Sequence, residues 1–125
     1  MNPKFIIATN RNQGDTKKVL CVCTAGILRS ASISTVLTQE YGYNTRVVGC
    51  DPNALCHIEW QHVAWADEIV CANEEHKEYI LERFNDYLGD GEDRNKIIVL
   101  GIEDIFKYME PDLVHLINIR YDNAK

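Results

Sequence analysis

Apolar and polar residues follow two alternating patterns along the chain. Four short apolar runs have the length and the β-branched content of strands that are buried on both faces of a sheet. These runs cover residues 19–23, 45–49, 68–72 and 96–100. Segments with apolar residues at helical spacing follow the runs, at residues 30–41, 58–65, from 73 and from 111. This β-α-β-α-β-α-β-α order predicts an α/β fold in three layers, with a four-stranded parallel sheet between helices.

Residues at the ends of the helical segments support these boundaries. Gly42 follows residues 30–41 at the position where a left-handed residue ends a helix. Asn73 is the expected N-cap of the third helix, and Pro111 suits the first turn of the last helix. The apolar positions that we expect these two helices to bury are Ile80, Leu81, Phe84, Leu88, Leu113, Leu116, Ile117 and Tyr121.

The length of 125 residues predicts a single domain, which we assign to residues 17–125. Residues 1–16 form an N-terminal extension, in which residues 5–8 could make a short strand. The formal net charge of −6 argues against general nucleic-acid binding. No apolar run approaches the roughly 20 residues that span a bilayer, and no signal peptide is evident. We therefore expect a cytoplasmic protein with no nucleic-acid or membrane partner.

The five cysteines form no Cys-x-x-Cys pair, and their number is odd. Cys21, Cys23 and Cys71 lie in the apolar runs, which predicts buried free thiols in a reducing compartment. Cys50 and Cys56, with the neighbouring His57, match no structural zinc spacing. The sequence thus predicts no metal and no other cofactor.

The most specific feature of the chain is the segment CTAGILRS at residues 23–30. A cysteine ends a strand, an arginine follows after five residues, and Ser30 opens a helix. Backbone N–H groups of such a loop and the helix N-terminus can bind an oxyanion, and a thiol placed there ionises more readily than a free one. Cys23 is therefore the candidate nucleophile, and the predicted phosphate-binding residues are Thr24, Ala25, Gly26, Ile27, Leu28, Arg29 and Ser30. Alternatively, Cys23 is only a buried residue at a strand end, and Arg29 caps a neighbouring group.

Residues 22–30 resemble the signature loop of the low-molecular-weight protein tyrosine phosphatases. Residues 65–69, with His76 downstream, and residues 100–113 resemble a small, mainly bacterial branch of predicted tyrosine phosphatases. The likeness covers residues 18–117 in the same order. It implies a flavodoxin-like fold and a phosphatase that hydrolyses a phosphate monoester, most simply protein phosphotyrosine, through a phosphocysteine intermediate. The implied partner is a phosphorylated protein or a small phosphate ester.

The resemblance also implies individual roles. Cys23 would attack phosphorus, Arg29 would bind the phosphate oxygens, and Ser30 would form a hydrogen bond with the thiolate. Asp104 matches an acidic position in the loop after the fourth strand, where it would protonate the leaving group and then activate water. Glu103 is the substitute candidate for this general acid.

The sequence departs from the family at several of these positions. Gly26 stands where asparagine is usual, and it can take a positive φ but offers no side-chain hydrogen bond. Ala31 stands where proline is common, and Glu103 and Ile105 replace a proline and an acid. Gly26 predicts a less rigid loop, Ala31 alters the entry into the helix, and the changes at positions 103 and 105 weaken the assignment of the acid. Together these departures favour anion binding at Cys23 over efficient catalysis.

Aromatic residues near the predicted site are candidates for its walls. Phe106 and Tyr108 would line a slot for a phenyl ring, and His57 with Trp60 would form the opposite wall, although aromatic residues at such positions also serve as core. By default, the four histidines are expected on the surface or on helices: His57, His62, His76 and His115.

Three other functions are compatible with the same loop. An arsenate reductase could use the loop for arsenate, but it would need further thiols such as those of Cys50, Cys56 and Cys71. A phosphocarrier would hold phosphate and pass it on, and Arg29 in the loop argues against this function. A non-catalytic module could bind a phosphorylated or anionic partner in the same place.

Overall fold

The computed structural model describes residues 16–88 and 96–124. The predicted short strand at residues 5–8 and almost all of the predicted N-terminal extension lie outside these residues.

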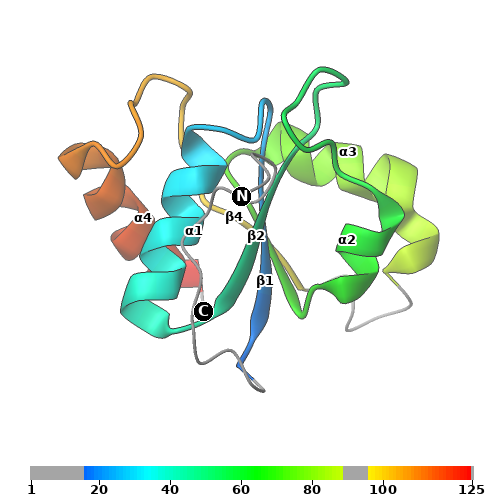
Figure 1. The fold of residues 1–125 in the computed structure, drawn as a ribbon, viewed down its shortest axis with the longest axis horizontal. Coiled ribbons are helices and arrows are strands. Elements are labelled where there is room, and N and C mark those ends of the chain that lie inside the picture. The colour runs from blue at the N-terminus through cyan, green and yellow to red at the C-terminus, as the bar shows by residue number, and fades with distance from the viewer. Residues whose placement is uncertain (1–15, 89–95, 125) are drawn as a thin grey trace.

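The described chain contains a four-stranded sheet in which every paired strand is parallel. The strands are β1 Lys18–Cys23, β2 Asn44–Gly49, β3 Glu68–Cys71 and β4 Ile97–Val99. Their spatial order is β2-β1-β3-β4, so β1 pairs on both of its edges (Figure 1). The predicted parallel sheet is confirmed.

Helices cover both faces of this sheet (Figure 1). One face carries α1 Arg29–Tyr41 and α4 Pro111–Ala124, and the other carries α2 Trp60–Trp65, α3 Glu74–Phe84 and the 3₁₀ turn η2 Asn85–Tyr87. Each boundary of the strands and of α1 and α2 lies within two residues of its predicted position. The three-layer architecture that the sequence predicts is therefore confirmed.

The alternation of side chains along β1 builds two cores. Val19 and Cys21 face α1 and α4, whereas Leu20 and Val22 face α2 and α3. Of the residues predicted to be buried in α3 and α4, five are buried and three are half-buried. The buried ones are Ile80, Leu88, Leu113, Ile117 and Tyr121, and the half-buried ones are Leu81, Phe84 and Leu116.

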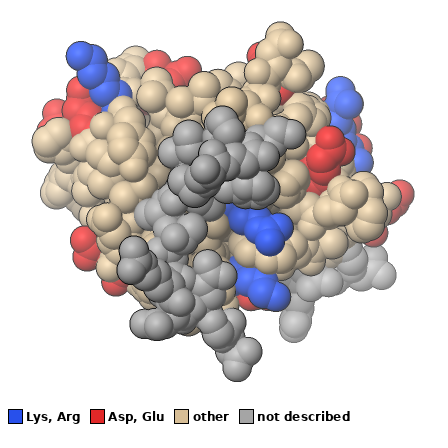
Figure 2. Space-filling model, in the orientation of Figure 1, with Lys and Arg blue, Asp and Glu red and all other residues tan. Residues whose placement is uncertain are grey.

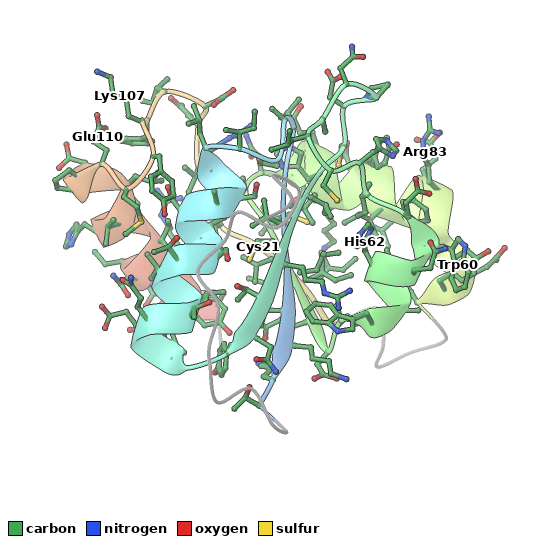
Figure 3. All side chains as sticks on the ribbon, in the orientation of Figure 1. Cys21, Trp60, His62, Arg83, Lys107 and Glu110 are labelled. Atoms are coloured by element: carbon green, nitrogen blue, oxygen red, sulfur yellow. The ribbon has the colours of Figure 1, made fainter. Side chains whose placement is uncertain are left out.

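All five cysteines are free thiols. Cys21 lies at the centre of the molecule, between the sheet and its helices (Figure 3). Burial raises the pKa of the Cys21 and Cys71 thiols, and it raises the pKa of half-buried Cys50 to about 12. These three thiols therefore remain protonated and weakly nucleophilic at neutral pH.

A buried charge anchors the amino-terminal end of β3. The Glu68 carboxylate is buried and accepts hydrogen bonds from Lys17 Nζ at 2.7 Å and Tyr121 Oη at 2.5 Å. A buried carboxylate is tolerated only when its oxygens are paired in this way. These contacts fix α4 and the chain before β1 at the end of the sheet opposite to the predicted site.

Three loops follow the carboxyl ends of the strands and gather at one end of the sheet, at the top of Figure 1. They comprise residues 24–28 after β1, residues 50–59 after β2 and residues 100–110 after β4. Parallel α/β sheets form their sites at this end. On the face drawn in Figure 2, the described Lys and Arg side chains lie in separate places rather than as one basic surface. None of the described helices is long and apolar enough to cross a membrane.

Candidate active site

The loop after β1 encloses the thiol of Cys23. This residue ends β1 and is almost fully buried. Its Sγ accepts a hydrogen bond from the Gly26 backbone N–H at 3.1 Å and lies 3.0 Å from Ser30 Oγ. Ser30, which the resemblance places beside the thiolate, is thus in hydrogen-bond contact with the sulfur. The sulfur sits among donors that suit a negatively charged nucleophile.

The chain after β2 holds the outer side of this loop. Cys50 N–H donates to the Cys23 carbonyl at 2.9 Å, Asp51 N–H to the Thr24 carbonyl at 2.9 Å and Leu55 N–H to the Ala25 carbonyl at 3.3 Å. In a trans peptide the N–H points away from the preceding carbonyl. Because these carbonyls face outward, the N–H groups that follow them face the sulfur, as observed for Gly26. Backbone hydrogen bonds from the chain after β2 therefore hold this loop in place. The loop sequence itself does not reveal them.

Two glycines allow the close approach between this loop and β2. Gly26 has a φ of +70°, and a Cβ there would lie 2.9 Å from the Gly49 nitrogen. A Cβ on Gly49 would lie 2.5 Å from the Thr24 carbonyl oxygen and 2.7 Å from the Ala25 carbonyl carbon. A side chain at either position would displace the loop, so the departure at Gly26 has a steric reason. No pattern in the sequence singles out Gly49.

Arg29 links the loop to the chain after β4. Its side chain is only 3% exposed. Nη1 donates to the Ile102 carbonyl at 2.9 Å, Nη2 donates to Thr24 Oγ1 at 3.3 Å, and Nε lies 3.6 Å from Asp104 Oδ1. The predicted acid and the predicted arginine therefore meet although 75 residues separate them in the sequence. The Asp104 side chain is 63% exposed, so it faces solvent on the side away from Arg29.

A pocket of about 210 Å³ opens over the thiol. Its walls include Cys23, Ala25, Ile27, Leu28, Arg29 and Asp104. Thus one thiol, one cation and one carboxylate share a small and otherwise apolar space. Glu103 is exposed and is not part of this lining.

The two predicted slot residues lie on the same loop as Asp104, outside that lining. Phe106 packs against the core on the α1 side of the sheet. Tyr108 Oη lies 2.9 Å from Thr35 Oγ1 of α1, and the Tyr108 side chain is half exposed. A role for either residue in binding substrate stays a prediction.

Polar residues of α1 hold the loop that carries Asp104. Ser32 Oγ accepts a hydrogen bond from Met109 N–H at 2.9 Å, and Met109 has a φ of +57°, which is uncommon for a residue with a side chain. Ser32 and Thr35 lie one turn apart on the same side of the helix. The altered helix entry of the sequence therefore has a function in positioning this loop.

The expectation that His57 and Trp60 form the opposite wall is wrong. Trp60 stacks on Tyr87 with ring centroids 5.3 Å apart, and it points away from the sheet (Figure 3). His57 Nε2 lies 3.2 Å from Tyr79 Oη and lines a separate open hollow. Both residues belong to the α2–α3 side of the molecule, where they contact Tyr79 and Tyr87.

His76 is a site neighbour that the sequence analysis left as an ordinary helix residue. It does lie on α3, but it is only 1% exposed. Its Nδ1 accepts a hydrogen bond from Asn73 N–H at 3.0 Å, and its Nε2 lies 3.1 Å from Thr24 Oγ1. Burial and the nearby Arg29 charge lower the pKa of His76 to about 4, against weaker opposing effects of Glu75 and Asp104. His76 is therefore neutral at pH 7.

Within residues 16–88 and 96–124, the candidate site included, no group of three or more His, Cys, Asp or Glu side chains is arranged to hold a metal ion.

Substitution of Gly49 by alanine should disturb the loop while leaving every polar group of the pocket in place. The new Cβ would contact two backbone atoms of the loop, which cannot move aside as a side chain can. We expect Gly49→Ala to lower the free energy of unfolding by about 1–3 kcal/mol and to weaken binding of inorganic phosphate. Chemical denaturation and calorimetry measure the two effects, and unchanged phosphate affinity would contradict the close packing.

The buried neutral His76 should make stability depend on pH. The unfolded chain takes up a proton near pH 6.5, whereas the folded chain does so only near pH 4. Stability is therefore greatest above pH 6.5 and falls as the pH drops toward 4, by at most about 3 kcal/mol. Denaturant unfolding between these pH values measures the slope, and His76→Gln should reduce it. Equal slopes in both proteins would contradict a buried neutral imidazole.

Comparison with solved structures shows which fold this is. The tyrosine phosphatase Wzb from Escherichia coli K30 in complex with phosphate matches with a TM-score of 0.66 at 14% identity, over 86% of this chain and 95% of that chain. Vibrio vulnificus Wzb in complex with benzylphosphonate matches with a TM-score of 0.63 at 16% identity, over 87% and 94% of the two chains. The YwlE arginine phosphatase from Geobacillus stearothermophilus matches with a TM-score of 0.56 at 17% identity, over 86% and 85%.

No protein-family model matches the chain, and no curated protein is significantly similar to it in sequence. The likeness to the solved structures is thus one of fold, since the sequences have diverged widely. It agrees with the resemblance that residues 22–30 carry in the sequence. The chain has the fold of the low-molecular-weight protein tyrosine phosphatases.

Proposed function

We propose that this protein is a cysteine-dependent phosphatase that hydrolyses a phosphate monoester, protein phosphotyrosine in particular, through a phosphocysteine intermediate. One observation carries the proposal: the Cys23 thiol, the Arg29 guanidinium and the Asp104 carboxyl line the same small pocket. The solved structures with this fold include tyrosine and arginine phosphatases, which supports a hydrolytic role.

In the first step, the phosphate binds in the loop, where Arg29 and backbone N–H groups offset its charge. Cys23 Sγ attacks phosphorus, so that an S–P bond forms while the ester P–O bond breaks. Asp104, entering this step as the carboxylic acid, gives its proton to the departing oxygen. The contact between Asp104 and Arg29 must open for this transfer, and the exposure of Asp104 allows it.

In the second step, water attacks the phosphocysteine. The Asp104 carboxylate takes a proton from this water as its oxygen bonds to phosphorus, and the S–P bond breaks. Inorganic phosphate leaves, and the thiolate and the carboxylic acid are regenerated. Ser30, which contacts Sγ, stabilises the charge on the departing sulfur.

The geometry favours Asp104 over Glu103 as the acid. Asp104 lines the pocket and contacts Arg29, whereas Glu103 is exposed and is not among the lining residues. Proton transfer requires a donor within hydrogen-bond reach of the leaving oxygen. The place of Asp104 in the pocket therefore supports this residue as the acid.

The lining of the pocket favours an aryl phosphate. Ile27 and Leu28 give it apolar walls, which suit a phenyl ring better than a charged guanidinium. A phosphoarginine side chain would need acidic partners, and Asp104 is the one carboxylate among the lining residues. We therefore place phosphotyrosine ahead of phosphoarginine as substrate.

No contact in the described chain favours the alternative functions. An arsenate reductase needs a second thiol that can attack Cys23, but none of the other cysteines lines the pocket. Arg29 beside the thiol is unexpected in a phosphocarrier, because it promotes hydrolysis. A non-catalytic module that binds an anionic partner would differ from the proposed phosphatase by its lack of turnover.

Rapid mixing with p-nitrophenyl phosphate tests the proposal. We expect a burst of p-nitrophenol stoichiometric with enzyme, followed by steady turnover, because the phosphocysteine forms before it is hydrolysed. Cys23→Ser should abolish both phases, whereas Cys56→Ser, which removes a thiol outside the pocket, should keep them. Phosphate binding without burst or turnover in the wild type would identify a non-catalytic anion-binding module.

Substitution of the acid should depend on the leaving group. Asp104→Asn is expected to lower kcat/KM for phenyl phosphate, which reports the formation of the phosphocysteine, by about 10²-fold or more, because the leaving oxygen of this ester needs a proton. The loss for p-nitrophenyl phosphate should be much smaller, and Glu103→Gln is the matched control with little effect on either ester. Equal losses for both esters, or a larger effect of Glu103→Gln, would remove Asp104 from this role.

A further inference from the structure

The Thr24 hydroxyl joins a buried histidine to the arginine of the pocket. Thr24 Oγ1 lies 3.1 Å from His76 Nε2 and 3.3 Å from Arg29 Nη2. His76 is on α3, on the face of the sheet opposite to α1, and it is almost fully buried. The three side chains thus form a chain of contacts in which His76 and Thr24, outside the pocket lining, connect to Arg29, which is part of it.

The direction of each hydrogen bond follows from its donor. The backbone N–H of Asn73 can only donate, so the Nδ1 that it contacts carries no hydrogen. A neutral imidazole has one N–H, which must therefore be on Nε2. The low pKa of His76 keeps the ring neutral at pH 7. His76 Nε2–H accordingly donates to Thr24 Oγ1.

Arg29 approaches the same oxygen, also as a donor. A guanidinium has no acceptor, so Nη2–H donates to Thr24 Oγ1. The hydroxyl oxygen has two lone pairs, and the two donors occupy both. His76 therefore keeps the Thr24 hydroxyl from turning its hydrogen toward Arg29, where it would repel the guanidinium.

The second terminal nitrogen of Arg29 is fixed independently. Nη1–H donates to the Ile102 carbonyl at 2.9 Å, a partner from the chain after β4. With both terminal nitrogens held, the plane of the guanidinium is set, and the Nε–H remains directed toward Asp104. Holding an arginine in place before its ligand arrives reduces the side-chain entropy lost on binding.

We propose that His76 is a positioning residue that, through the Thr24 hydroxyl, fixes the Arg29 guanidinium for phosphate binding. The inference rests on the proposed function, since it assigns Arg29 to the phosphate. The competing view is that His76 only caps α3, because Asn73 and His76 form a reciprocal capping box. A glutamine at this position satisfies both roles, because one amide can accept from Asn73 N–H and donate to Thr24.

Four single variants separate positioning from capping. Thr24→Val removes the hydroxyl without touching the helix cap, and Thr24→Ser is its control. His76→Leu removes the donor and the cap, whereas His76→Gln keeps both functions. Inorganic phosphate titrated by calorimetry gives binding independently of turnover, and p-nitrophenyl phosphate gives kcat and KM separately.

If His76 acts through Thr24, Thr24→Val and His76→Leu each weaken phosphate binding by about 5–30-fold. His76→Gln stays within about twofold of the wild type, and Thr24→Ser, which keeps the hydroxyl, binds phosphate more tightly than Thr24→Val. The double variant Thr24→Val/His76→Leu binds phosphate no more weakly than Thr24→Val, because the two residues act in one path. A purely structural role would instead lower the melting temperature of His76→Leu and leave phosphate binding by Thr24→Val unchanged.

The tautomer of His76 provides a test that needs neither binding nor turnover. A ¹H–¹⁵N spectrum through two-bond couplings should show the proton on Nε2 at pH 7, and a proton on Nδ1 would overturn the proposal. Unchanged phosphate binding in Thr24→Val, or additive losses in the double variant, would also overturn it. Wild-type protein that binds phosphate without hydrolysing the ester would defeat the proposed function alone. Absence of phosphate binding would defeat both.

Discussion

The candidate site depends on the contact between two stretches of backbone. The loop after β1 lies directly on the end of β2, and Gly49 has no side chain to keep it away. The N–H groups of Cys50, Asp51 and Leu55 donate hydrogen bonds to the outward-facing carbonyls of the loop. The loop N–H groups then point inward, that of Gly26 onto the Cys23 sulfur, and such an arrangement suits an anion. Every other feature of the pocket is arranged around a loop fixed in this manner.

Arg29 connects that loop with two other parts of the molecule. Its contact with the Ile102 carbonyl joins the loop to the chain after β4, and its contact with Thr24 joins it to His76 on α3. Ser32, one turn further along α1, holds Met109 and with it the segment that carries Asp104. Elements from both faces of the sheet therefore converge on one guanidinium. A change in any of them reaches the pocket through hydrogen bonds rather than through the apolar core.

Sequence patterns predicted the sheet, its helices and the meeting of Cys23 with Arg29, because strand alternation, helix caps and the loop motif are local signals. The roles of Gly49 and His76 arise from contacts between distant segments, which no local pattern encodes. The sequence holds one weak signal for His76, because this residue stands three residues after the N-cap Asn73, in a capping-box position. The expected wall of His57 and Trp60 was wrong because the course of the chain after β2 follows from packing against α3, not from the order of residues.

Because the chain is acidic overall, binding of an anionic substrate depends on the positive charge inside the pocket. With a net charge of −6, the protein repels an anionic substrate except where a cation is concentrated. In the free site, Asp104 lies 3.6 Å from Arg29 Nε and offsets part of its charge, but this pair is open to solvent on the side of the acid. Such a pair is weak, worth about 0–1 kcal/mol, so an incoming phosphate can displace the carboxylate at little cost. In the proposed reaction, the displaced Asp104 would turn toward the ester oxygen. Phosphate binding and placement of the acid would then be one event, because both groups compete for the same guanidinium.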